Sequence, residues 1–388
     1  MASSVVDSLL PFLYFSISLL LSMIALKSSQ RYRPSLLVLL VYFGILAFRG
    51  IRDVSSSLLV ADTLGLFLLI WLSHMACVLC TEKYVLPRDN TMKWKAAYKI
   101  LFNARWINTD RQAPDIRRHP QAEAENKYYQ ESTGYFRGQK MNRGKFLRNR
   151  VLSVITIYAI NTVYQHVVLA SHPEYYQGLS MSDVLPSKQT YIRRLPNVTG
   201  RETMIRSMLA FHFVWSAWAI LTGIHNVLAF IFVAVTLDEP EDWPPLYGRI
   251  SQCYTLRSFW GKFWHRLVYR SYTNCGIILS RDILGLERKS VFGKLVINFT
   301  VFFLSGVVHM LVTLQLGCSC GYWEDLYWFF LNFAAILAES VVQGVFSKVL
   351  GTGGRSRMTN KALGYVWVFG FLFWSLPKSH FPKMRCSP

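Results

Sequence analysis

Histidine side chains inside apolar runs are the residues of this sequence best placed to do chemistry. The clearest is His309, in the apolar run 293–316. It lies about 24 Å from the cytosolic end of that run, at 1.5 Å per residue. An ionisable group at such a depth is costly and marks a functional site by default, and a neutral imidazole can accept a proton. We expect His309 to be catalytic; the alternative is a packing histidine bonded to a backbone carbonyl or to Asn332.

Two polar residues of the next apolar run, 323–347, are candidates to support His309. Counted from the cytosolic end of that run, Asn332 lies at a similar depth to His309, and Glu339 lies about two helical turns nearer the cytosol. The three groups can share a polar cavity, in which Asn332 and Glu339 fix the tautomer of the imidazole.

The other histidines do not predict a metal site. A membrane di-iron centre needs several imidazoles that converge at helical spacing. No two histidines of this chain are three or four residues apart; they stand at 74, 119, 166, 172, 212, 225, 265, 309 and 380. We therefore predict no metal, and we expect His74, His166, His212 and His225 to be packing residues whose polar neighbours satisfy them.

The segment 257–270 (RSFWGKFWHRLVYR) combines an aromatic face with a basic stripe. On a helix of about 100° per residue, four large apolar side chains fall on one side: Trp260, Phe263, Trp264 and Leu267. Three cations spaced by four residues form the stripe: Lys262, Arg266 and Arg270. His265 and Tyr269 lie on the flank. We expect an interfacial helix at the cytosolic surface, whose cations meet either lipid headgroups or the phosphates of a nucleotide such as coenzyme A.

The composition of the chain predicts the class of protein that positions these groups. Of 388 residues, 52% are hydrophobic and only 16% are charged, whereas a soluble domain is about one quarter charged. This balance excludes a soluble enzyme, a disordered chain and a disulfide scaffold. The net charge of +20 fits cytosolic loops rich in Lys and Arg, so we expect the lipid bilayer, and not nucleic acid, as a partner.

Eight apolar runs are candidate membrane spans: 8–26, 35–48, 63–80, 151–169, 207–237, 293–316, 323–347 and 362–377. The predicted fold is all-α, a polytopic transmembrane bundle of about eight spans with interfacial amphipathic helices. The run 207–237 reaches about 46 Å as one helix, and a hairpin broken near Gly223 is the alternative. One long crossing is consistent with the basic loops, because a hairpin moves the loop that carries Lys348 and Arg355 to the lumen.

Charge places the segments between the spans on the two sides of the membrane. Segment 83–150 has sixteen Lys and Arg against six Asp and Glu and is expected to be cytosolic, with an interfacial helix at 92–106 and a polar loop at 107–148. Segment 172–203 is then lumenal and carries a glycosylation sequon at Asn197. We expect an endoplasmic reticulum protein with a lumenal N-terminus. Cys318 and Cys320 are expected to be oxidised if their loop is lumenal.

Three motifs, in this order, resemble the wax synthase branch of the membrane-bound O-acyltransferases. They are Asp242-Trp243-Pro244-Pro245-Leu246-Tyr247-Gly248, Arg257-Ser258-Phe259-Trp260-Gly261-Lys262-Phe263-Trp264-His265, and Ser305-Gly306-Val307-Val308-His309. Histidine replaces the plant-type asparagine at 265, and Met310 stands where relatives often have glutamate. Both departures are similar to fungal enzymes that acetylate terpenoid and meroterpenoid alcohols.

The resemblance implies one acyltransferase domain over 1–388, with its catalytic region at 238–345. It moves an acyl group, with acetyl favoured, from acyl-CoA to a hydroxyl of a lipophilic alcohol of secondary metabolism. His309 is the general base, and His265 orients the thioester or stabilises the oxyanion. The residues expected to bind coenzyme A are Lys262, Arg266, Arg270, Trp260 and Trp264, with Tyr269 in support.

Three alternatives remain open from the sequence. A wax or sterol ester synthase uses the same chemistry with a long-chain donor. A proton-coupled transporter uses His309 and Glu339 as a relay and consumes no acyl-CoA. A membrane scaffold without catalysis tolerates alanine at its histidines.

Overall fold

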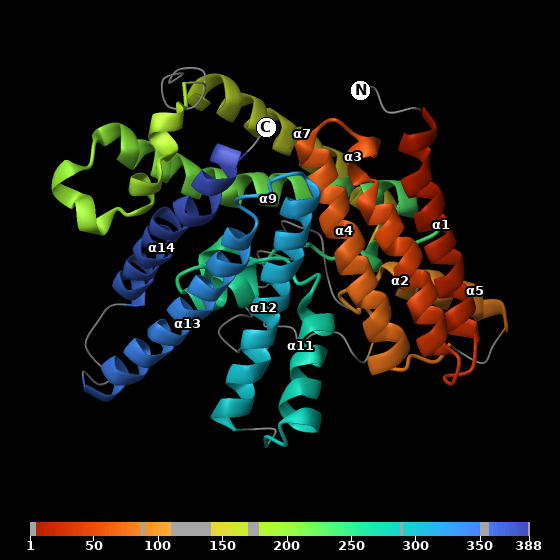
Figure 1. Cartoon of the computed structure of the whole chain (residues 1–388). Coiled ribbons are helices and arrows are strands. Elements are labelled where there is room, and N and C mark those ends of the chain that lie inside the picture. Colours follow the sequence, from red (N-terminus) through yellow and green to blue (C-terminus); the bar gives the residue numbers. More distant parts are fainter. Residues whose placement is uncertain are drawn as a thin grey trace. The chain divides into compact units, whose positions relative to one another are not determined.

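The described part of the chain is helical. The structure, a computed structural model, describes residues 5–86, 90–109, 141–169, 178–287, 290–349 and 357–386. Every regular element in these ranges is a helix, and they contain no β-strand (Figure 1). The predicted all-α fold is confirmed.

Long helices occupy all eight predicted apolar runs. They are α1 (Val5–Lys27), α2 (Arg33–Arg49), α4 (Leu58–Ala76, continued as a π-helix to Thr81), α7 (Arg143–Val163, continued as a π-helix to Leu169), α9 (Gly200–Ala234), α12 (Val291–Gln315), α13 (Trp323–Val349) and α14 (Arg357–Cys386). Five of them contain a stretch long and apolar enough to cross a membrane: Val6–Lys27, Leu58–Thr81, Gly200–Ala234, Val291–Gln315 and Trp323–Val345. The chain is an integral membrane protein, and the number of eight spans stays a prediction.

The long fifth run is a single helix and not a hairpin. Helix α9 has 35 residues and continues through Gly223, so the expected single crossing is confirmed at the level of secondary structure. Thr199 caps its start, because the Thr199 hydroxyl accepts a hydrogen bond from the Glu202 N–H at 3.2 Å.

The chain divides into two compact units. The first unit holds residues 1–113, 267–335 and 382–388. Here α1 packs along α2, and α4 packs against α12. Helix α5 (Asn90–Phe102) covers most of the predicted interfacial helix 92–106. It buries Ala97, Ile100 and Leu101 in a core that includes Trp71, whose indole donates to the Leu101 carbonyl at 3.0 Å.

The second unit holds residues 114–266 and 336–381. Its main helix pair is α7 and α9. Arg150 of α7 joins this pair to the loop that follows α9, because its guanidinium donates to Asn226 and to the Trp243 carbonyl, each at 2.7 Å. The Asn226 side chain donates in turn to the Ser153 hydroxyl at 2.8 Å. The prediction of a single domain over 1–388 stays a prediction.

The prediction of one continuous helix over 257–270 is wrong. The structure has a short helix α10 (Leu256–Ser258), a π-helix over Phe259–Phe263, and a separate helix α11 (Tyr269–Ile277). The helix ends because the Trp264 N–H closes a wide turn on the Phe259 carbonyl, and Trp264 then becomes extended, with ψ of 151°. The predicted stripe therefore does not run along one helix.

Candidate functional site

The two histidines of the second and third motifs lie in different units, His309 in the first and His265 in the second. Around His309, Gly306 determines how closely two helices pack. A Cβ atom added to Gly306 lies 2.9 Å from the Leu326 side chain and 3.1 Å from the Leu326 Cα. Without it, α13 approaches α12, and the Phe329 ring stacks on the His309 imidazole with centroids 5.2 Å apart. The glycine of this motif thus has a packing role.

Two carboxylates interact with the His309 ring. Asp325 is only 5% exposed and accepts hydrogen bonds from the Thr313 hydroxyl and from the Lys383 ammonium, each at 2.6 Å. The carboxylates of Asp325 and Asp62 both interact electrostatically with the imidazole. Asp62 comes from α4, which packs closely on α12 because Gly65 leaves room for Val312.

Asn332, the predicted partner of His309, is held by its own helix. It is fully buried, and its side-chain amide donates to the Trp328 carbonyl at 2.9 Å. Within the described part of the first unit, no hydrogen bond to a His309 ring nitrogen is present, and the ring is half-buried. An imidazole in such a setting can accept a proton from a substrate hydroxyl.

Four residues of the surroundings of His309 were not predicted from the sequence: Asp62, Thr313, Asp325 and Lys383. A signal for two of them was present. Asp62 directly precedes the apolar run 63–80, and Asp325 lies at the start of 323–347. By the predicted alternation of spans, both lie on the lumenal side, as does the nearer end of the helix of His309. Acidic residues at matching depths on neighbouring helices were therefore available as candidates.

His265 lies among aromatic rings. Tyr247 packs edge-on against it with centroids 5.9 Å apart, and Trp264 packs at 5.7 Å. The Trp264 ring stacks on Phe213 of α9 at 5.4 Å and 9°. Trp260 adds a further contact to Trp264 at 5.1 Å. These contacts fix the position of the backbone on which His265 stands.

The motif 242–248 holds the segment of His265 in place. The Gly248 N–H donates to the Phe263 carbonyl at 2.8 Å, and a Cβ on Gly248 has no room against the Lys262 carbonyl. Tyr247 donates to the Ala217 carbonyl of α9 at 3.1 Å, and its burial raises the pKa of its hydroxyl. The Tyr247 phenol is therefore a neutral donor that anchors the two motifs to α9.

Glu339 anchors the start of the second motif. Its carboxylate accepts the Leu256 N–H at 2.7 Å and the Trp367 indole N–H at 2.9 Å. Both donors bind the same oxygen, Oε2, and the side chain is buried. In the second unit, Glu339 thus ties α10 and α14 to the C-terminal half of α13.

The three predicted cations differ in their surroundings. Lys262 is exposed on the π-helix. Arg266 donates to the Gly261 carbonyl at 3.0 Å. In the first unit, Arg270 forms an ion pair with Glu82 at 2.5 Å, and Asn274 donates to the same carboxylate at 2.6 Å. Tyr269, beside Arg270, is 40% exposed.

Two of the histidines predicted to pack have backbone partners. The His74 ring contacts the Ile100 carbonyl at 2.7 Å, and the exposed His166 ring contacts the Thr162 carbonyl at 2.9 Å. Among the described residues, no group of three or more His, Cys, Asp or Glu side chains has an arrangement that could hold a metal ion. Asn197 of the sequon is exposed and stands two residues before Thr199, the cap of α9.

Comparison with known proteins supports the resemblance seen in the motifs. Residues 243–332 match the membrane bound O-acyl transferase family. Acetyltransferase spyB of Aspergillus fumigatus is 32% identical over 187 residues, 45% of this chain and 32% of the relative. Acetyltransferase aurG of Calcarisporium arbuscula is 28% identical over 196 residues, 50% of this chain and 47% of the relative.

A third relative is similar over a comparable share. Acetyltransferase atnC of an Arthrinium species is 31% identical over 192 residues, 49% of this chain and 44% of the relative. The matches thus span between 32% and 47% of the length of these three relatives. They confirm the predicted resemblance to the membrane-bound O-acyltransferases and to fungal acetyltransferases.

Proposed function

We propose that this chain, whose residues 243–332 match the membrane bound O-acyl transferase family, is an acyl-CoA-dependent O-acyltransferase of the membrane. The favoured donor is acetyl-CoA, and the acceptor is a hydroxyl of a lipophilic alcohol, a terpenoid or meroterpenoid of secondary metabolism. The observation that carries the proposal is that the matched segment includes both His265 and His309. The relatives named acetyltransferases support acetyl as the transferred group.

In the proposed reaction, His309 is the general base. Its neutral imidazole takes the proton of the substrate hydroxyl while the oxygen attacks the thioester carbonyl, which requires that oxygen within about 2.6–3.2 Å of the ring nitrogen. The C–S bond then breaks, the ester forms, and the thiolate of coenzyme A takes the proton from the imidazolium. Asp325 and Asp62 stabilise the imidazolium between these two transfers. A covalent acyl-enzyme is not required, because both substrates are held together.

His265 has the proposed role of a donor to the thioester oxygen. A fixed donor at the developing oxyanion contributes roughly 10²–10³ in rate. The contacts of the adjacent Trp264 with Tyr247 and Phe213 support this role, because such a donor must already be oriented before the reaction. Asn332 and Glu339 act as positioning residues for the two segments.

Coenzyme A is proposed to bind through cations of the second motif and the residues after it. Lys262 is exposed and Arg266 is bound to a backbone carbonyl, so both can reach phosphate oxygens at low cost. Arg270 shares Glu82 with Asn274 and contributes after that ion pair rearranges. Trp260 and Trp264 belong to the same segment and supply apolar surface for the adenine and the acyl chain.

We propose the endoplasmic reticulum as the location, with a lumenal N-terminus and glycosylation at Asn197. The exposure of Asn197 supports its modification. Endoglycosidase H should increase the mobility of the wild-type protein on a gel and leave Asn197→Gln unchanged. An unaltered wild-type mobility, in a host that glycosylates a control protein, contradicts this assignment.

The proposed activity is tested on membranes that contain the full chain. Radiolabelled acetyl-CoA and palmitoyl-CoA are supplied with hydroxylated terpenoids, sterols and fatty alcohols, and labelled esters are separated by chromatography. We expect acetyl esters of a terpenoid alcohol, made by the wild type and not by His309→Ala. Preferred use of palmitoyl-CoA indicates a wax or sterol ester synthase, and no ester from any pair contradicts the proposed function.

A further inference from the structure

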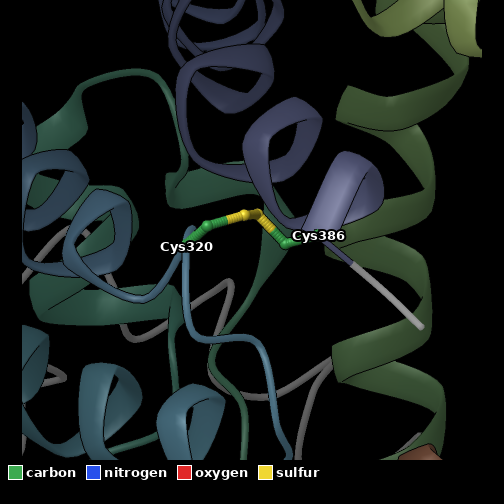
Figure 2. The surroundings of a disulfide bond; sticks show 2 residues. All are labelled: Cys320 and Cys386. Carbon is green, nitrogen blue, oxygen red and sulfur yellow. A yellow bond between two sulfur atoms is a disulfide. The ribbon is translucent and has the colours of Figure 1, made fainter.

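A covalent bond joins the end of α14 to the loop that follows α12. Cys320 forms a disulfide with Cys386, 66 residues later (Figure 2). The two backbones lie close together, because a Cβ on Gly321 is only 3.0 Å from the Lys383 nitrogen. Cys318, two residues before Cys320, is a free thiol. A disulfide is typical of an oxidising compartment, which agrees with the lumenal side predicted for this loop.

The same turn of α14 brings a cation to a buried carboxylate. Lys383, one turn before Cys386, donates to Asp325 at 2.6 Å, and the side chain of Asp325 is only 8% exposed. Asp325 also accepts the Thr313 hydroxyl at 2.6 Å. Thr313 is one turn beyond His309 on α12. A chain of contacts therefore leads from the disulfide to the helix turn that carries the imidazole.

Three charged groups from three elements act on His309. They are Asp62 of α4, Asp325 of α13 and Lys383 of α14, and all three interact electrostatically with the ring. A carboxylate favours the protonated imidazole, and an ammonium disfavours it. Lys383, which is bound to Asp325, therefore acts on the ring in the opposite sense to the carboxylate.

We infer that the disulfide Cys320–Cys386 and the ion pair Lys383–Asp325 form a C-terminal clamp that positions His309 and the charges that act on it. The effect of this clamp on catalysis rests on the proposed function. Its effect on the imidazole does not depend on the substrate. The clamp residues are positioning residues, because they act through Asp325 and Thr313 on the imidazole and do not touch the reacting atoms.

The first test needs no substrate. Membranes with the full chain are treated with diethyl pyrocarbonate, which modifies neutral imidazole, at a series of pH values. Mass spectrometry then measures the modified fraction of the His309 peptide. In Asp325→Asn the midpoint of modification should move to lower pH, and in Lys383→Met to higher pH. A merely structural role does not produce shifts of opposite sign. Unchanged midpoints, or shifts in the same direction, overturn the inference.

The second test measures catalysis. Cys386→Ser should lower kcat about tenfold, within the loss of up to about 10² that a displacement of 1 Å can cause, and should leave the KM for acetyl-CoA unchanged. Cys318→Ser, in the same loop, is the matched control and should retain wild-type kcat. Equal kcat values for both variants, at equal protein levels in the membrane, overturn the inference. A wild type without acyl transfer contradicts the proposed function instead, and the modification test still decides on the clamp.

Discussion

His309 and His265 stand in surroundings of opposite character. Around His309, two carboxylates and an ammonium act on a half-buried ring, on which the Phe329 ring packs. Around His265, aromatic rings dominate, with Tyr247 and Trp264 in direct contact. The first setting can stabilise a change of charge on the ring, whereas the second holds the ring and its backbone in place.

A glycine allows close packing near each histidine, but the packed elements differ. In α12, Gly306 lets two helices approach side by side, close to Leu326. In the second unit, Gly248 lets the motif 242–248 approach the last carbonyls of a π-helix, at Lys262 and Phe263. The proposed proton acceptor is thus placed by helix packing and nearby charge, and the proposed orienting donor by a network of rings and backbone bonds.

The largest effect on activity is expected from the loss of the proposed base. His309→Ala should lower kcat by about 10²–10⁴, the usual contribution of general base catalysis, while the protein still accumulates in the membrane. His166→Ala is the control, because His166 is exposed and contacts only the Thr162 carbonyl among the residues described around it. Ester formation by labelled acetyl-CoA measures the effect. Similar kcat values for His309→Ala and the wild type remove His309 from the mechanism.

Substitution of His265 distinguishes an orienting donor from a second base. His265→Ala should lower kcat by roughly 10²–10³, as for the loss of one oxyanion donor. His265→Asn should recover most of this loss, because an amide N–H can donate but does not accept a proton at neutral pH. Both variants are compared with the wild type across pH. Equal losses in the two variants contradict the role of donor.

The helices and the main candidate could be predicted from the sequence because their signals are local. An apolar run of sufficient length predicts a span wherever it occurs, and the eight runs are all helical in the structure. His309 stands out because an ionisable residue inside such a run is rare. The single helix over 207–237 followed from charge in loops on both sides of it, which is also a property of the sequence.

The rest depends on contacts between distant segments. The helix predicted over 257–270 ends after Phe263, whose carbonyl accepts a hydrogen bond from the Gly248 N–H. Periodicity within the segment does not reveal a bond to a residue outside it. The C-terminal clamp joins Cys320 to Cys386 and Asp325 to Lys383. Spacing does not pair one of seven cysteines with another, and Asp325 at a helix start has the pattern of an ordinary first-turn carboxylate.

A smaller effect is expected from the glycine that supports His265. The Cβ of Gly248→Ala overlaps the Lys262 carbonyl and should displace the motif 242–248 from the π-helix, with a loss in kcat/KM of up to about 10². Gly261→Ala is the matched control, since nothing lies within 4 Å of its added Cβ. The modification profile of His309 should stay as in the wild type. Equal kcat/KM for the two variants contradicts the role of the Gly248 contact.

The smallest effect is expected for a single exposed cation. Lys262→Gln should raise the KM for acetyl-CoA roughly two- to fivefold, because an exposed ion pair contributes only about 0.2–1 kcal/mol, and should leave kcat unchanged. Lys294→Gln removes another exposed cation, at the start of α12, and should leave both constants unchanged. Both KM values are measured at low ionic strength and again in salt, which should reduce the difference. If Lys262→Gln has the wild-type KM under both conditions, its ammonium faces lipid headgroups, and donor binding rests on the rings and on Arg266.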